Sequence, residues 1–394
     1  LIFRIFRKNL MLFKLKKSYK LCIMNLYYVF CLLLFLGACS SSPESSDHKR
    51  NLVNPILTEY SDKNNLSDYA FFKSSIQEFS SRSFERARRW ALLKEGPHVL
   101  SFVSSDVIEG SQPLASPLGP DPTLIDWMPW WMDLLKIEVS TLLLSKESDL
   151  KAVSPDSCLK IYQQRLIEGL NSATPPALET QEAESFIAQL QLKEQKAPED
   201  LWKLSAPSES TEEQIHAWQR AVGMEPKKNQ KQREFYFSRN GVRRRILSIL
   251  ENNQLSFAVE VPQDPYRSAE YFSKSNQKNL CQRLNLGLSF SKLQTEAFVC
   301  SDLEGPQVAK MDPKLLFALT KIAEAPERSM TSLYKLRCQE LADFHRRQWN
   351  SMDTIQLVKR LKLYPQVEKR LRYFATMESK ALLCIAAKYR TQNN

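Results

Sequence analysis

The spacing of apolar residues along this chain changes from a helical period to a strand period and then back. Over residues 66–94 the apolar residues fall three or four positions apart, which is the spacing of one face of an α-helix. From residue 234 the pattern changes to alternation, clearest over residues 255–261, and this predicts half-buried strands. Helical spacing returns from residue 312. We therefore predict an α+β fold that is mostly helical, with a five- or six-stranded antiparallel meander between helical N- and C-terminal regions.

These patterns divide the chain into five segments. They are a signal peptide at 1–38, a flexible tether at 39–64, a helical region at 65–230, an antiparallel β-meander at 231–305 and a C-terminal helical region at 306–394. In the meander, a turn at Arg239-Asn240-Gly241 predicts a hairpin over 235–250. Further strands are predicted at 255–261, 268–273, 284–290 and 295–301. Ahead of the meander, a capping box at 210–213 predicts the start of a helix and Gly223 predicts its end.

Glycine is scarce, and its scarcity excludes several classes of enzyme. The chain of 394 residues has only 9 glycines, and no two lie closer than nine positions. The dinucleotide-binding G-x-G-x-x-G, the P-loop and the G-x-S-x-G nucleophile elbow are therefore all absent.

The N-terminus has the layout of an export signal. Residues 1–20 carry seven Lys and Arg residues and no acidic residue, and an apolar run follows from Leu26 to Leu36. This order of a basic region, a short apolar region and small residues is typical of a secretory signal peptide. The run is also shorter than the roughly 20 residues that cross a bilayer. Met11 would begin a leader of more usual length, 28 residues before Cys39.

Leu36-Gly37-Ala38-Cys39 resembles the lipobox of bacterial lipoprotein precursors. The resemblance implies that the lipoprotein signal peptidase recognises Leu36, Gly37 and Ala38 and cuts before Cys39, whose thiol carries the diacylglycerol and hence fatty acids such as palmitate. Ser40, directly after the lipidated cysteine, implies retention at the outer membrane, facing the periplasm. The serine-rich residues 40–46 fit a flexible tether behind such an anchor.

The net charge of +11 is unevenly distributed. Residues 39–230 hold 20 Lys+Arg and 28 Asp+Glu, whereas residues 231–394 hold 28 and 16. The basic C-terminal clusters are Arg346-Arg347, Lys359-Arg360 and 369–373. They are either solvated faces or contacts for an anionic partner, such as lipid headgroups, an envelope protein or a cell-wall polymer. An exported protein is not expected to meet nucleic acid.

Five cysteines follow Cys39, namely Cys158, Cys281, Cys300, Cys338 and Cys384. In an oxidising compartment they allow at most two disulfides among themselves, and we consider the pairs Cys281–Cys300 and Cys338–Cys384 first. The alternative is that all five are small buried hydrophobic residues.

Three tryptophans lie close together at Trp127, Trp130 and Trp131, just ahead of a predicted helix. They form either a stacking platform for sugars or lipid headgroups, or the packed first turn of a buried helix.

No residue pattern indicates catalysis. The four histidines lie far apart, H-E-x-x-H is absent, and a Ser/His/Asp triad assembles in space rather than along the sequence. We therefore predict no catalytic residue, no metal site and no cofactor. The leading interpretation is a lipid-anchored protein of the bacterial cell envelope with a non-enzymatic binding or structural role. The alternative is a cell-envelope hydrolase whose catalytic site cannot be read from the sequence.

Overall fold

The fold is that of a computed structural model of the chain. It describes residues 66–89, 98–108, 114, 124–147, 156–172, 206–207, 210–226, 231–239, 242–251, 254–261, 284, 299–300, 308–311, 330–363 and 365–392. The predicted signal peptide, with Leu36, Gly37, Ala38 and Cys39, and the predicted tether lie outside these residues.

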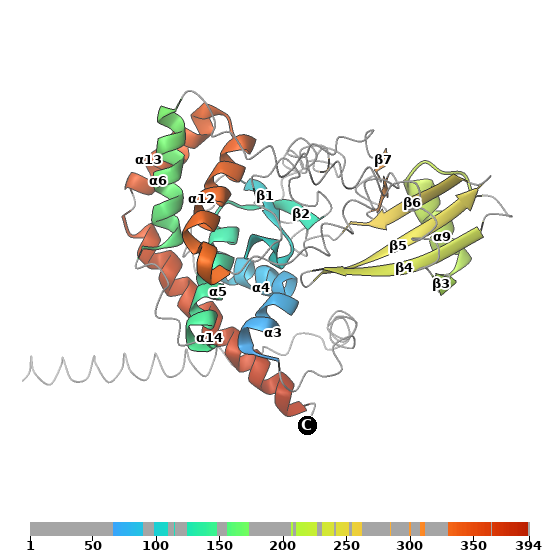
Figure 1. The fold of residues 1–394 in the computed structure, drawn as a ribbon, viewed down its shortest axis with the longest axis horizontal. Coiled ribbons are helices and arrows are strands. Elements are labelled where there is room, and N and C mark those ends of the chain that lie inside the picture. The colour runs from blue at the N-terminus through green and yellow to red at the C-terminus, as the bar shows by residue number, and fades with distance from the viewer. Residues whose placement is uncertain are drawn as a thin grey trace, which may run out of the picture.

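The described residues form a helical part and a sheet part (Figure 1). The helical part contains α3 (Asp68–Ser74), α4 (Ile76–Arg89), α5 (Met132–Glu147), α6 (Cys158–Asn171), α12 (Met330–Gln348), α13 (Ser351–Leu363) and α14 (Val367–Gln392). It joins segments from both ends of the chain, since α5 and α6 pack against α12 and α14. The predicted α+β class, mostly helical with a segregated antiparallel sheet, is confirmed.

Helix α5 is the centre of the helical part. Every side chain from Met132 to Ser140 is buried, on all sides of the helix, and α3, α4, α6, α12 and α14 all contact it. A helix that is buried all round is expected to be apolar all round. However, α5 also buries Asp133, Lys136 and Glu138, so these three charged groups need partners inside the core.

A short two-stranded sheet leads into α5. Strand β1 (His98–Phe102) pairs antiparallel with β2 (Ile125–Pro129), with Leu100 opposite Trp127. The turn η2 (Ser105–Val107) follows β1. This pair lies inside the region predicted as helical. Because nearly every side chain of both strands is buried, their sequence lacks the alternation that marks a half-buried strand.

The sheet part is a six-stranded antiparallel sheet in the order β3-β4-β5-β6-β8-β7. Its strands are β3 (Ala206–Pro207), β4 (Lys231–Arg239), β5 (Val242–Glu251), β6 (Gln254–Glu260), β7 (Val299–Cys300) and β8 (Val308–Met311). The predicted hairpin is confirmed, because Arg239 pairs with Val242 across the turn. The strand predicted at 255–261 is also confirmed as β6. The strand predicted at 295–301 is present at its described residues as β7. The prediction at 268–273 lies outside the described residues, as does 284–290 except Leu284, which is helical rather than extended as predicted.

The sheet extends past the predicted boundaries of the meander, and its order departs from that of a simple meander. Strand β3 falls within the region predicted as helical, and β8 falls beyond 305. Strand β8 also inserts between β6 and β7. Strands of two and four residues are too short to show a period, so the sequence pattern does not reveal them.

Helix α9 (Glu212–Ala221) packs on this sheet. Ile215, Trp218 and Val222 form a small core with Leu247 and Ile249 of β5. The predicted capping box exists but is shifted by one residue. Thr211 is the N-cap, and its side chain accepts a hydrogen bond from Gln214. Gly223 ends the helix with φ of 70°, as predicted for a glycine stop.

Candidate functional site

The predicted tryptophan cluster lies mainly in the core. Trp130 and Trp131 are 5% and 3% exposed, and Trp127 is partly buried against the same core. Trp130 stacks on Tyr162 of α6 with ring centroids 6.2 Å apart, and Trp131 meets Phe374 of α14 edge-on at 6.5 Å. A stacking platform needs an open ring face, which the two buried rings do not offer. Their burial favours the alternative, the packed first turn of helix α5.

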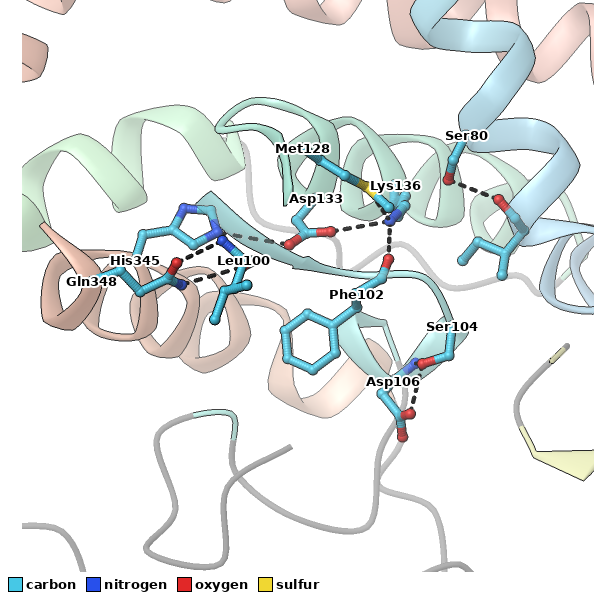
Figure 2. Close-up of polar contacts among 11 residues, drawn as sticks. Ser80, Leu100, Phe102, Ser104, Asp106, Met128, Asp133, Lys136, His345 and Gln348 are labelled. Atoms are coloured by element: carbon cyan, nitrogen blue, oxygen red, sulfur yellow. Dashed lines mark hydrogen bonds and ion pairs between the residues drawn. The ribbon is translucent and has the colours of Figure 1, made fainter. Parts of the chain in front are cut away.

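The most unusual polar feature of the described residues is a buried cluster that no sequence motif indicated. It consists of Asp133 and Lys136 from α5, Tyr162 from α6 and His345 from α12, and all four are fully buried. Figure 2 shows Asp133 between His345 and Lys136, alongside strand β1. We call these four residues the core polar cluster. Three helices contribute to it, so its members are up to 212 positions apart in the sequence.

The members of the core polar cluster form a continuous chain of contacts. The Tyr162 hydroxyl lies 2.8 Å from His345 Nδ1. On the other side of the imidazole, Nε2 lies 3.7 Å from Asp133 Oδ2, which is longer than a hydrogen bond. The other oxygen of Asp133 accepts from Lys136 Nζ at 3.1 Å. Lys136 Nζ also donates to the carbonyl oxygen of Phe102 in β1.

Electrostatics indicates the protonation states of Asp133, His345 and Tyr162 at neutral pH. Burial raises the pKa of Asp133, but the charge of Lys136 and the contact with His345 lower it more, so the pKa lies below its ordinary value. Burial lowers the pKa of His345 more than the nearby carboxylate raises it. Burial and the charge of Asp133 raise the pKa of Tyr162 well above its ordinary value. At neutral pH the cluster therefore holds an ionised Asp133, a neutral His345 and a protonated Tyr162.

These states fix the tautomer of His345. The ionised carboxylate of Asp133 favours the imidazole proton on Nε2, the nitrogen that faces it, and Nδ1 then accepts from the hydroxyl of the protonated Tyr162. A histidine beside a carboxylate is also the arrangement of a catalytic base. Here, however, the group on Nδ1 is a buried tyrosine, and all members of the cluster are closed to solvent. The arrangement suits a packing role, because it compensates buried charges and fixes three helices relative to one another.

A second buried carboxylate, Glu138, lies next to a disulfide. Glu138 Oε1 accepts from the backbone N–H of Cys158 at 2.8 Å, at the first turn of α6, and lies 3.5 Å from the Tyr334 hydroxyl. Burial raises the pKa of Glu138 although the Cys158 amide opposes it. A carboxylate at a helix N-terminus is stabilised by the unpaired amides there.

Cys158 of α6 and Cys338 of α12 form a buried disulfide, with Cα atoms 5.4 Å apart. The predicted pair Cys338–Cys384 is therefore wrong, and Cys384 is itself disulfide-bonded to a different cysteine. The sequence could not show this, because the pairing depends on α6 packing along α12 across 180 positions. The predicted pair Cys281–Cys300 lies outside the described side chains.

The basic C-terminal clusters separate into two kinds. Arg346 donates to the carbonyl oxygen of Gly169 at 2.7 Å, so it belongs to the contact between α12 and α6, and Arg347 beside it is partly buried. Lys359 and Arg360 of α13 are exposed, as are the cations of 369–373. The second group is the more exposed of the two and is the better candidate for contact with an anionic partner.

Comparisons with known proteins give no relative. A scan against protein-family models and searches of curated proteins and solved structures found no significant match for this chain. Within the described ranges, no group of His, Cys, Asp and Glu is arranged to hold a metal ion. Among the helices described, none is both long and apolar enough to span a membrane.

Proposed function

We propose that this chain is a lipid-anchored protein of the bacterial cell envelope, with a binding or structural role and no catalytic one. Cys39 would carry the lipid, at the outer membrane and facing the periplasm. The structural observation that carries the proposal is the buried disulfide between Cys158 and Cys338.

The disulfide supports export because structural disulfides form and persist in oxidising compartments and are rare in the cytosol. Cys158 and Cys338 are both fully buried and come from different helices. An exported protein needs a leader, and the basic and apolar N-terminal residues have the layout of one. Two independent features of the chain, one at its N-terminus and one in its core, thus point to the same compartment.

The binding or structural role is supported by where the polar groups lie. The histidine and carboxylate that most resemble catalytic machinery, His345 and Asp133, are fully buried. A catalytic group has to touch its substrate, and these two have no exposed atom with which to do so. The cations of α13 and the first turns of α14, in contrast, are exposed.

The anchor is tested with Cys39→Ala in cells grown with a labelled palmitate. We expect the variant to lose the label and to leave the membrane fraction, because the thiol that accepts the diacylglycerol is gone. Cys31→Ala, a cysteine of the leader outside the lipobox, is the matched control and should keep both. A Cys39→Ala protein that is still labelled and still sediments with membranes would refute the proposal.

Export is tested separately by the state of the thiols. Cells are quenched in acid, and the denatured protein is alkylated either before or after reduction. After digestion, mass spectrometry shows whether the peptides of Cys158 and Cys338 carry the alkyl group. We expect both thiols to react only after reduction. Reaction of both before reduction would place the folded protein in a reducing compartment.

A further inference from the structure

The outer face of α13 exposes apolar side chains. Among the described residues, five large hydrophobic side chains are substantially exposed, and four of them lie within residues 352–373. They are Met352 at 59%, Ile355 at 36%, Leu363 at 74% and Tyr373 at 58% exposed. Single exposed apolar residues are ordinary on a protein surface, but a concentration of them usually marks a contact.

The face has a regular order around the helix. Thr354, Leu357, Val358 and Leu361 are the buried side of α13, which packs on α6. At about 100° per residue, Met352 and Leu363 project from the opposite side, and Ile355 lies at the edge of that side. Lys359 also lies on this exposed side of α13. Arg360 and Lys362 lie roughly 80° to either side of the centre line of the exposed side. An apolar strip bordered by cations is typical of a helix that lies in the plane of a membrane surface.

The first turns of α14 continue the positive charge. Residues 351–373 contain six Lys and Arg residues but only two carboxylates. One of these, Glu368, lies 3.6 Å from Arg372 on the same helix. Lys369 and Arg370 are exposed beside Tyr373. The outer face of α13 and the start of α14, which we call the basic corner, therefore carries a surplus of cations around its apolar side chains.

The basic corner lies far from the start of the described chain. Arg390, near the end of α14, donates to the carbonyl oxygen of Leu66 at 2.9 Å and to Asp68 at 2.7 Å. Figure 1 shows this end of α14 beside α3, and α13 at the opposite end. The 26 residues of α14 span about 39 Å. The 27 residues from Cys39 to Leu66 reach at most about 95 Å when extended, so an anchor at Cys39 and the basic corner can reach the same membrane.

We propose that the basic corner docks on the anionic headgroups of a phospholipid leaflet. Met352, Ile355 and Leu363 would enter the boundary between headgroups and acyl chains, and the Lys and Arg residues around them would contact lipid phosphates. This inference deepens the proposed function and rests on it, since the anchor brings the corner to the leaflet. The docking would then set the orientation of the anchored protein.

Charge argues against a second copy of the chain as the occupant. In a two-fold dimer the same patch faces itself, so the corner of one copy would meet the cations of the other. An anionic polymer would satisfy the cations but would give no reason for the exposed apolar side chains at their centre.

The test uses the full chain after leader removal, with Cys39→Ala to remove acylation. Its binding to vesicles of phosphatidylethanolamine and phosphatidylglycerol in a 3:1 ratio is measured by co-sedimentation at fixed salt, with pure phosphatidylcholine vesicles as the neutral comparison. We expect binding to the anionic vesicles and at least about tenfold weaker binding to the neutral ones.

Two double variants separate the two parts of the surface. Lys359→Glu with Lys362→Glu reverses the charges, and Met352→Ser with Leu363→Ser removes the apolar anchors. We expect each to weaken binding to anionic vesicles at least about tenfold. Lys146→Glu with Lys335→Glu, two exposed lysines on α5 and α12, is the matched control and should bind as the parent does. All the substituted side chains are exposed, so thermal unfolding should hardly change and checks that each variant is folded.

Three outcomes would overturn the inference. Unchanged vesicle binding in both double variants would show that the corner is not the contact. Loss in the charge variant alone, with equal binding to a soluble polyanion, would indicate an anionic polymer instead. A dimer in sedimentation that disappears in the Met352→Ser, Leu363→Ser variant would indicate a second copy. If the vesicle test fails but the parent protein is labelled with palmitate at Cys39, the docking inference is refuted and the proposed function stands. If the basic corner binds vesicles but the parent protein is not labelled, only the lipid anchor is refuted.

Discussion

At the scale of single residues, the core polar cluster places two opposite charges of α5 in the interior of the protein. Asp133 and Lys136 lie one helical turn apart with no exposed surface, and each compensates the charge of the other. Isolated charges at such positions would destabilise the fold strongly, whereas a well-packed pair or an apolar replacement is tolerated.

Replacing Asp133 by Asn should reduce the free energy of unfolding by about 3–5 kcal/mol, because it leaves the buried Lys136 without its counter-charge. The free energy is measured by urea unfolding at pH 7.5. Lys146→Gln, on the exposed end of the same helix, should change it by less than about 0.5 kcal/mol. The double variant Asp133→Leu, Lys136→Met should recover much of the loss. A loss below about 1 kcal/mol in Asp133→Asn would show that the pair is not a compensated charge.

Stability should also depend on pH through His345. Its pKa is lower in the folded protein than the ordinary value of 6.5, so the unfolded chain takes up the proton first. The contribution of His345 is therefore fully present above about pH 6.5 and is lost as the pH falls, by up to about 1.4 kcal/mol per pH unit. Glu138 has the opposite effect on the free energy of unfolding. Its pKa is raised in the folded protein, so its contribution to stability is lost as the pH rises above 4.5.

The comparison that isolates His345 is urea unfolding of the parent and of His345→Gln between pH 7.5 and 5. The variant keeps Glu138, so the Glu138 effect cancels in the difference. We expect a flatter profile for the variant, and parallel profiles would contradict the assignment of a neutral buried histidine.

At the scale of elements, α6 and α12 are held together by more than apolar packing. The Cys158–Cys338 disulfide joins them, and Arg165 of α6 forms a bidentate pair with Asp343 of α12, with the shorter contact at 2.9 Å. Both helices lie in regions that the sequence predicts to be helical, but their pairing was not predicted, because no sequence pattern records which helices meet across a separation of 180 positions.

Removing this covalent bond should lower stability appreciably. Cys158→Ala with Cys338→Ala should lose about 3–5 kcal/mol of unfolding free energy, because the bond closes a loop of 180 positions in the unfolded chain. Urea unfolding of the parent with and without reductant should show a shift of midpoint in the same direction. A variant as stable as the oxidised parent would mean that the bond adds nothing to the contact between the helices.

At the scale of the whole molecule, the helical part and the sheet part have separate apolar cores. The core under α9 contains only residues of the sheet part, whereas Val242, at the start of β5, is buried in the core of the helical part. Within the described residues, the sheet thus reaches the core of the helical part at Val242, the start of β5.

Separate cores predict separate responses to mutation. Trp218 packs under the sheet and lies beneath Arg245, 4.5 Å from the guanidinium to the ring centroid. Trp218→Ala should cost the sheet part about 3–5 kcal/mol and speed hydrogen exchange in peptides of β5 and β6. Peptides of α5, α6 and α12 should exchange as in the parent. Equal acceleration in both sets would show that the two parts unfold as one.

The sequence by itself determined the fold class, the main hairpin, the stop of α9 at Gly223 and the absence of glycine-dependent phosphate loops. These features are local, because hydrophobic period, turn chemistry and capping act over a few residues. It also contains the basic and apolar N-terminal residues and the Leu36-Gly37-Ala38-Cys39 sequence that predict an export leader and a lipobox, and the proposed function depends on that prediction. The sequence also showed that the C-terminal region is basic, but it did not show which of the Lys and Arg residues are buried and which are exposed.

Only the tertiary structure decided the rest. It buried Trp130 and Trp131, paired Cys158 with Cys338, brought His345 to Asp133 and left Lys359 and Leu363 exposed. Each of these depends on which helices pack together, and many helix arrangements satisfy the same apolar period. Contacts between residues up to 212 positions apart follow from three-dimensional packing, which one sequence pattern does not record.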